Sequence, residues 1–271
     1  MELVRANGLD VALEITGDGP PLLLLHGATS GRDDFAAQLP LLRSAFRCYL
    51  PDARGHGATR WDAADGFRYG WLVDDVLALA DALGLETFHL LGFSMGAATA
   101  LGLAAASPDR LRSLVLVGVS AEREPRGSVG RRLFDPERLA REEPAWADDL
   151  ARRHDPVQGE GAWRRLLPAI AADIADQQLV DDAGLAAIRC PTLVMVGDRD
   201  PFVPLEQAIR LRRTIRDARL LVAPGCGHEV LRRRPAIARE ALASFYREIG
   251  IPLGTARAAT RDSTPEPERV R

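Results

Sequence analysis

The sequence predicts an α/β fold, in which a mostly parallel, twisted sheet carries helices on both faces. Two observations lead to this fold class. Short apolar runs of strand length recur along the chain, and stretches with helical periodicity lie between several of them. The apolar runs are nearly continuous instead of alternating with polar residues, which indicates strands buried on both faces, as in a parallel sheet.

The predicted elements follow one another in a regular order. A short antiparallel pair at one edge of the sheet is expected from residues 3–5 and 11–15, and the central strands are expected at 22–25, 46–50, 88–91, 114–119, 192–196 and 220–223. Trp71–Leu83 has its apolar residues on one helical face and is followed by Gly84, a typical helix stop. Met95–Ala106 has the composition of a helix.

This alternation is interrupted between residues 121 and 187, a segment with helical pieces and no convincing strand. We therefore expect a core formed by residues 1–120 and 188–251, with 121–187 as a helical lid placed over the sheet. Residues 252–271 are rich in Pro, Arg, Glu and Thr without periodicity, which predicts a disordered C-terminal tail.

Composition limits the function classes. A net charge of −3 over 271 residues argues against a general nucleic-acid binder, which needs a concentrated basic face. The 3 cysteines are an odd number without paired spacing, so they indicate neither a disulfide framework nor a metal site. No signal peptide or membrane-spanning run is apparent. We expect a cytoplasmic protein that acts on a small molecule without cofactor, metal, membrane or nucleic acid; the sequence leaves the oligomeric state open.

A serine lies at a predicted strand-to-helix turn, in the pattern Gly92-Phe-Ser94-Met-Gly96. On such a tight turn the serine adopts an unfavourable backbone conformation that exposes its hydroxyl at the carboxyl end of the strand. The residues two before and two after it must be small because strand and helix come close there. The helix N-terminus behind the serine favours developing negative charge. The alternative interpretation is that Ser94 only caps the helix.

A serine hydroxyl becomes a useful nucleophile only when a base takes its proton. His228 follows the last predicted strand, and Asp198 and Asp200 follow the strand before it, so either carboxylate could orient the imidazole. The order serine, acid, histidine along the chain is typical of one particular architecture.

These motifs together resemble the α/β-hydrolase fold superfamily. The resemblance covers roughly residues 10–248 and rests on motifs in their expected order: His26-Gly27-Ala28, Asp52-Ala-Arg54-Gly55-His56-Gly57, Gly92-Phe-Ser94-Met-Gly96, Pro191-Thr-Leu-Val-Met-Val-Gly197 with Asp200 and Pro204, and Gly227-His228. The chain departs from the family's pattern at Ala97, where a second glycine is familiar, and at Arg233, where an acidic residue is frequent.

The resemblance implies a role for each matching position. Ser94 would be the nucleophile, His228 the general base and Asp200 the acid that orients it. The backbone N–H groups of Ala28 and Met95 would form the oxyanion hole. His26, Arg54 and His56 would shape loops instead of reacting.

Serine instead of aspartate at position 94 argues against epoxide hydrolases and haloalkane dehalogenases of this fold. It favours cleavage of an ester, lactone or thioester through an acyl-enzyme. The alternatives are a C–C bond hydrolase, a cofactor-free haloperoxidase, lyase or oxygenase chemistry with unacylated Ser94, or a non-catalytic small-molecule receptor. Substrate contacts are expected from Phe93, Trp146, His154 and Trp163, with Trp71 as a further aromatic candidate and Arg123, Arg126 or Arg132 as partners of a substrate carboxylate.

Overall fold

The computed structural model describes residues 1–62, 66–121, 134–176 and 180–254 of the chain. Most of the predicted C-terminal tail, and Arg123, Arg126 and Arg132, therefore lie outside the described residues. Within the described residues, no helix combines the length and the apolar character that crossing a membrane requires.

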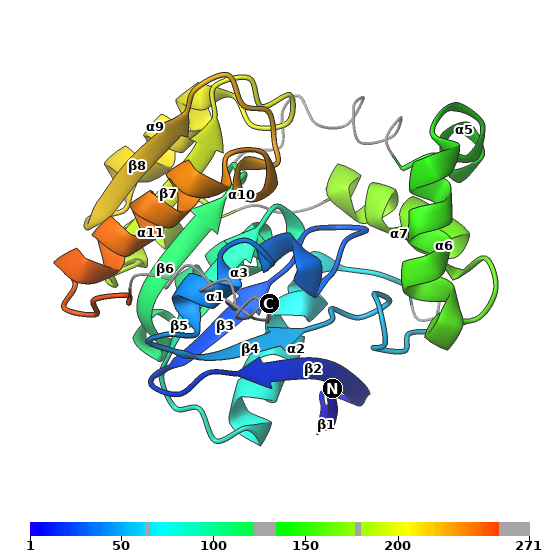
Figure 1. Cartoon of the computed structure of the whole chain (residues 1–271), viewed down its shortest axis with the longest axis horizontal. Helices are drawn as coiled ribbons and strands as arrows, with labels where there is room; N and C mark the ends of the chain where they lie inside the picture. Colours follow the sequence, from blue (N-terminus) through cyan, green and yellow to red (C-terminus); the bar gives the residue numbers. More distant parts are fainter. Residues whose placement is uncertain (63–65, 122–133, 177–179, 255–271) are drawn as a thin grey trace, which may run out of the picture.

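The centre of the molecule is an eight-stranded sheet in the order β1-β2-β4-β3-β5-β6-β7-β8 (Figure 1). The strands are β1 Glu2–Ala6, β2 Leu9–Thr16, β3 Pro21–Leu25, β4 Arg47–Pro51, β5 Phe88–Phe93, β6 Leu111–Val117, β7 Thr192–Gly197 and β8 Ala218–Ala223. β1 pairs with β2 and β2 with β4 in antiparallel fashion, and the remaining pairs are parallel. The predicted fold class and the antiparallel edge pair are confirmed.

Several strand boundaries differ from the sequence prediction by one to three residues, and β6 and β8 show this most clearly. β6 begins at Leu111 instead of Leu114 and ends at Val117 instead of Val119. It stops there because the next residue, Gly118, has a φ of +65°, a left-handed backbone conformation that does not fit an extended strand. β8 begins two residues before the predicted Leu220, at Ala218, where it pairs with Thr192 of β7.

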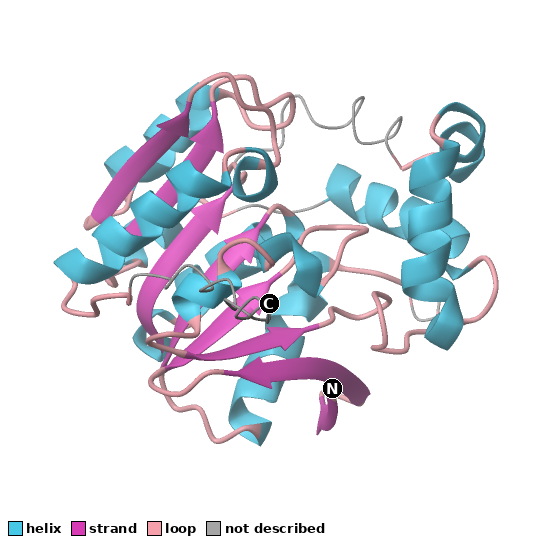
Figure 2. Ribbon diagram, viewed as in Figure 1, coloured by secondary structure: helices cyan, strands magenta, loops and turns pink. Residues whose placement is uncertain are grey.

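Helices cover both faces of the sheet (Figure 2). On one face, side chains of the sheet pack against α2 Tyr69–Ala82, α3 Met95–Ala106, α8 Asp182–Ala187 and α9 Leu205–Thr214. On the other face they pack against η1 Arg32–Phe35, α1 Leu39–Leu42, α10 Val230–Arg233 and α11 Pro235–Glu248. A short helix, η3 Pro108–Arg110, leads into β6.

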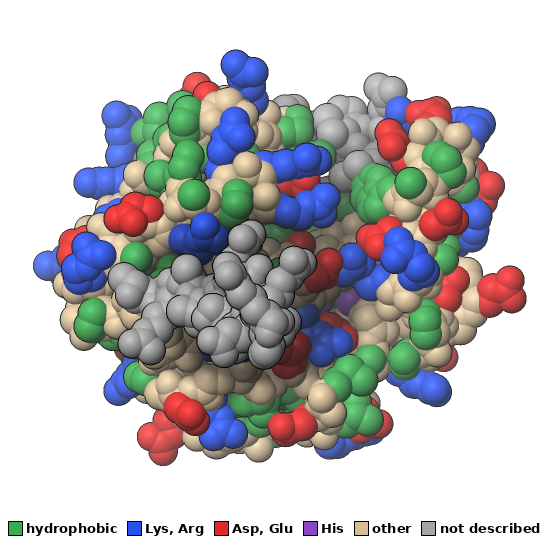
Figure 3. All heavy atoms as spheres, in the orientation of Figure 1, with side chains coloured by type: hydrophobic (Ala, Val, Ile, Leu, Met, Phe, Trp, Pro, Cys, Tyr) green, Lys and Arg blue, Asp and Glu red, His purple; other side chains and the backbone are tan. Residues whose placement is uncertain are grey.

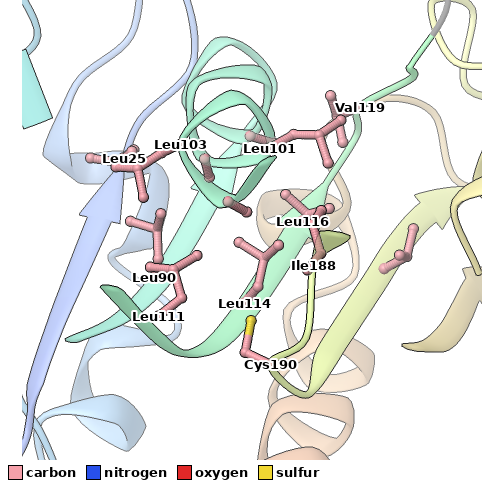
Figure 4. Close-up of a cluster of buried hydrophobic side chains, with 14 of the residues drawn as sticks. Leu25, Leu90, Leu101, Leu103, Leu111, Leu114, Leu116, Val119, Ile188 and Cys190 are labelled. Atoms are coloured by element: carbon pink, nitrogen blue, oxygen red, sulfur yellow. The ribbon is translucent and has the colours of Figure 1, made fainter. Parts of the chain in front are cut away.

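The first of these cores explains why the central strands have no polar alternation. Leu90, Leu114 and Leu116 point from β5 and β6 toward Leu101 and Leu103 of α3, and all of them are buried (Figure 4). Strands buried on both faces need apolar side chains at consecutive positions, and this requirement produces the continuous runs seen in the sequence.

The segment between β6 and β7 is helical where the structure describes it. α5 Pro136–Glu142, α6 Pro144–Gln158 and α7 Ala162–Asp176 gather beside the sheet and share an apolar cluster that includes Leu150 and Leu166 (Figure 1). α8 also falls in the segment expected to form the lid, but its Leu185 belongs to the core on the sheet face. We call α5, α6 and α7 the insert helices.

Candidate active site

Ser94 lies at the turn between β5 and α3, with φ of +52° and ψ of −111°. A non-glycine residue with positive φ is strained by roughly 1–3 kcal/mol, so the surrounding structure must enforce it. The enforcement is a close approach of backbones: a Cβ on Gly92 would lie 2.3 Å from the Gly96 carbonyl oxygen, and one on Gly96 would lie 2.0 Å from the Leu25 carbonyl oxygen. Only glycine fits at both positions.

The Ser94 side chain does not cap α3, although Ser94 occupies the N-cap position. Its Oγ lies 2.9 Å from His228 Nε2 instead. The interpretation of Ser94 as a simple helix cap is therefore wrong.

His228 is held on its other side by Asp200, whose Oδ2 lies 2.8 Å from His228 Nδ1. The Asp200 side chain is fully buried, and its Oδ1 accepts hydrogen bonds from the backbone N–H groups of Phe202 and Val203. A buried carboxylate with satisfied oxygens is a fixed acceptor, so it keeps the imidazole proton on Nδ1 and leaves Nε2 free to accept the serine proton.

Asp198, the competing carboxylate, has a different task. Its Oδ1 accepts a hydrogen bond from the Cys226 N–H at 3.0 Å, and the backbone N–H groups of Gly225 and Cys226 hold the pKa of Asp198 below its usual value. Asp198 thus anchors the loop that carries His228, and Asp200 alone of the two contacts the imidazole.

The imidazole of His228 is enclosed by aromatic rings and one glycine. Its ring centroid lies 5.3 Å from that of Phe93 and 4.9 Å from that of Phe202. On a third side lies Gly118, where a Cβ would come within 2.9 Å of His228 Cε1. These contacts leave the ring little freedom to turn away from Ser94.

Ala28 and Met95, the expected oxyanion-hole residues, line the same cavity as Ser94 and His228. Met95 is the first residue of α3, where backbone N–H groups have no partner within the helix. The neighbouring N–H groups of Ser94 and Gly96 donate to the carbonyl groups of Val117 and His26. Among the described residues, the Met95 N–H between them is left for a ligand.

The cavity in front of Ser94 has a volume of about 710 Å³ and lies between the sheet and the insert helices. This volume suits a small molecule, because ligand pockets are typically a few hundred to about 1,000 Å³. Its apolar wall is formed by the side chains of Tyr69, Phe93, Val119, Phe134, Trp146 and Phe202.

Charged side chains also line this cavity, and Figure 3 shows acidic residues and arginines gathered around the hollow beside the insert helices. Glu229, directly after His228, lies 3.3 Å from Arg232 and 3.1 Å from Arg233, so its charge is shared between two arginines on α10. Across the cavity, Arg153 of α6 is paired with Asp33 and Asp149.

Two expected substrate contacts, Phe93 and Trp146, line the cavity, but Trp163 and His154 do not. Trp163 is 4 % exposed and packs in the apolar cluster of the insert helices, where its indole contributes a large buried apolar area. His154 is fully buried and bonded to backbone groups. Trp71 is also elsewhere: its ring lies 5.2 Å from the Arg54 guanidinium carbon.

Sequence reasoning missed several cavity residues. Glu229 and Phe202 stand next to the predicted catalytic positions, so their closeness along the chain was an available signal. Tyr69 and Phe134 had no such signal, because they come from a helix and a loop whose packing decides which side chains face the cavity.

Within the described ranges, no group of three or more His, Cys, Asp and Glu side chains is arranged to hold a metal ion. The Ser94 hydroxyl, the His228 imidazole and the Asp200 carboxylate form a continuous relay beside the cavity. Such a relay can move a proton from Ser94 Oγ to His228 Nε2 while Asp200 stabilises the imidazolium.

Comparison with known proteins agrees with this geometry. Residues 22–241 match the alpha/beta hydrolase family. A 2-hydroxy-6-oxo-2,4-heptadienoate hydrolase from Pseudomonas putida is 32% identical over 251 residues, which is 84% of this chain and 89% of the relative. The chain belongs to the alpha/beta hydrolase family.

Solved structures support the same assignment for the fold. A meta-cleavage product hydrolase from Pseudomonas fluorescens superposes on this hydrolase with a TM-score of 0.78 at 22% identity, covering 92% of this chain and 98% of that one. A thermophilic esterase from Thermogutta terrifontis has a TM-score of 0.72 at 27% identity and covers 91% and 98% of the two chains.

Proposed function

We propose that this hydrolase cleaves a small-molecule acyl compound through a covalent ester on Ser94. The observation that carries the proposal is the continuous relay from Asp200 Oδ2 through His228 to Ser94 Oγ, which opens into a cavity of about 710 Å³. A relay of this kind with room for a small molecule beside the hydroxyl is suited to acyl transfer.

In the first half of the reaction, His228 Nε2 takes the proton of Ser94 Oγ as the oxygen bonds to the substrate's carbonyl carbon. The carbonyl π electrons move onto its oxygen, and the N–H groups of Ala28 and Met95 donate to that oxyanion. Each such donor is typically worth on the order of 10²–10³ in rate. The C–X bond then breaks, and His228 returns the proton to the leaving group.

In the second half, a water molecule gives its proton to His228 Nε2 and attacks the acyl carbon. The bond to Ser94 Oγ breaks, the serine recovers the proton, and the acid product leaves. Asp200 stays ionised throughout, because it stabilises the imidazolium without accepting its proton.

For the bond that is cleaved, we propose an ester or lactone C–O bond. An alkoxide or enolate leaving group needs only the proton that His228 carries, so the described side chains suffice. The 27%-identical esterase supports this choice.

A second candidate is hydrolysis of a C–C bond beside a ketone, favoured by the 32%-identical relative whose name specifies a 2-hydroxy-6-oxodienoate substrate. Here the leaving group is a carbanion, so the substrate must itself provide an electron sink. A panel of short-chain esters, lactones and one 2-hydroxy-6-oxodienoate, compared by kcat/KM, distinguishes the two candidates.

The proposal as a whole is tested with Ser94→Ala. This variant should lose activity by roughly 10⁴–10⁶-fold and should no longer be labelled by a fluorophosphonate, while its melting temperature stays close to that of the wild type. Hydrolysis that survives in this variant at the wild-type rate would contradict the acyl-enzyme.

A further inference from the structure

The residue after Ala28 is held by two histidines. Thr29 is 7 % exposed and has φ of +64°, a strained conformation for a β-branched residue. Its N–H donates to His56 Nε2 at 3.1 Å, and its carbonyl oxygen lies 3.4 Å from His154 Nε2. His56 comes from the loop after β4, whereas His154 comes from insert helix α6.

The backbone partners fix the tautomer of each ring. A backbone N–H can only donate, so His56 Nε2 is unprotonated, and its Nδ1–H donates to the Arg54 carbonyl oxygen at 3.0 Å. His154 Nδ1 accepts from the Gly57 N–H at 3.0 Å, which places its proton on Nε2, facing the Thr29 carbonyl oxygen. Both rings are fully buried, and their centroids lie 5.4 Å apart.

The other side of Ala28 is fixed as well. The Gly27 carbonyl oxygen lies 2.7 Å from His26 Nδ1 and accepts from Ser30 Oγ at 3.0 Å. In a planar trans peptide the N–H of the next residue points opposite to that carbonyl, so these bonds set the direction of the Ala28 N–H. Ala28 is therefore held in place through both Gly27 and Thr29, and one of the side chains that contact Thr29, His154, comes from an insert helix.

Further bonds tie α6 to the same loops. Gln158 Oε1 accepts from the Trp61 N–H at 3.1 Å, and Arg153 pairs with Asp33 on η1. With His154, these contacts make the position of α6 and the shape of the loop at residues 27–34 depend on each other.

We propose that His154 is a positioning residue for the reaction. Together with His56 it holds Thr29 in place, and this directs the N–H of the preceding Ala28 toward the oxyanion. The oxyanion hole is therefore complete only when α6 is packed against the loop at residues 27–34. This inference rests on the proposed function, in which Ala28 supplies one oxyanion donor. His154 acts through Thr29 and does not touch the substrate.

Two polar substitutions separate the clamp from simple packing. In His154→Asn, the short amide can replace Nδ1 and keep the bond to Gly57, but it does not reach Thr29. In His154→Gln, the longer amide can place an N–H where Nε2 was and keep the bond to Thr29. His89→Asn is the matched control, because His89 is another buried histidine, with Nδ1 2.7 Å from Ser113 Oγ on β6.

The readout is the ratio of kcat/KM for an oxygen ester to kcat/KM for its thionoester. The oxyanion hole favours the oxygen ester, because sulfur is a weak hydrogen-bond acceptor and a poor fit for donors set for oxygen. A misaimed Ala28 N–H lowers this ratio, whereas damage to folding or to the Ser94–His228 pair lowers both rates together.

We expect the ratio to fall about tenfold in His154→Asn, which is less than the rate effect of removing one oxyanion donor completely. In His154→Gln and His89→Asn the ratio should stay within about threefold of the wild-type value. In His56→Asn, the amide Nδ2–H can replace the Nδ1 donor to Arg54, but the acceptor of the Thr29 N–H is lost. This variant should lower the ratio as well and serves if His154→Asn does not fold. An unchanged ratio in folded His154→Asn or His56→Asn overturns the inference. Failure of the proposed function is recognised separately, by wild-type protein without ester hydrolysis or by activity in Ser94→Ala.

Discussion

Gly118 offers a quantitative test of how tightly the imidazole of His228 is seated. In Gly118→Ala, the new Cβ would lie 2.9 Å from His228 Cε1 and 3.2 Å from Nδ1, whereas ordinary carbon contacts begin at 3.4 Å. The ring must therefore shift by about 0.5 Å, which disturbs the hydrogen bond to Ser94 Oγ that is now 2.9 Å long. A misplacement of about 1 Å in a catalytic group can cost 10²-fold in rate, so we expect kcat/KM to fall by about 10- to 100-fold.

The same substitution also strains the backbone, because Gly118 has φ of +65°. An alanine in this conformation costs about 1–2 kcal/mol, which lowers the melting temperature of a chain of this size by at least about 2–4 °C. The assay is steady-state hydrolysis of the best ester in the panel, with a thermal melt of each variant.

Gly84→Ala is the matched control. Gly84 has φ of +68°, and apart from its chain neighbours no atom of the described residues lies within 4 Å of the position that a Cβ would take. Alanine there carries the same backbone strain without touching the imidazole. Its melting temperature should fall by a similar amount while kcat/KM stays at the wild-type value. Wild-type kcat/KM in folded Gly118→Ala would refute the reasoning.

Asp200→Asn should lower kcat by roughly 10⁴-fold because an amide donates to Nδ1 and fixes the wrong tautomer, whereas Asp198→Asn should cost no more than about tenfold; steady-state kinetics compares the two. Arg54→Leu should lower the free energy of unfolding by about 3–5 kcal/mol in urea titrations, because it leaves buried Asp75, now 2.6 Å from the guanidinium, without its cation. Burial lowers the pKa of several histidines in the folded chain, so on acidification they take up protons in the unfolded chain at a higher pH than in the folded one. The free energy of unfolding should therefore be constant above about pH 6.5 and fall as the pH drops toward 4. Each of the two histidines with a folded pKa of about 4 should contribute a loss of about 2 kcal/mol at pH 5. Thermal melts across this range check the direction, and a melting temperature that rises on acidification would contradict it. The histidines concerned are His56, His89 and His154.

Much of the fold was predictable because its causes are local. A strand in the middle of a parallel sheet is buried on both faces, so Phe88–Leu91 and Thr192–Val196 are apolar at every position except the buried His89 and Thr192. The turn at Ser94 was predictable for the same reason, since close backbones allow only glycine at positions 92 and 96. Strand ends were less predictable, as Gly118 shows by ending β6 early.

The candidate relay could also be predicted from the sequence, because its members follow three strands whose carboxyl ends meet at one edge of the sheet. What the pattern could not decide was which carboxylate faces the imidazole: Asp198 and Asp200 differ by two positions, and the turn between them sends one to the Cys226 N–H and the other to His228.

The sequence by itself determined the sheet, the turn at Ser94 and the strand ends that carry the relay, since each depends on neighbours along the chain or on strand order. The tertiary structure alone decided the walls of the cavity and the place of His154, which sequence reasoning assigned to the substrate and which lies beneath the loop that carries Ala28. The physical reason is that the side chains of a helix packed beside a sheet face the cavity, the core or the neighbouring loop. Only the packing of α6 against the rest of the molecule decides which of its residues faces each of them.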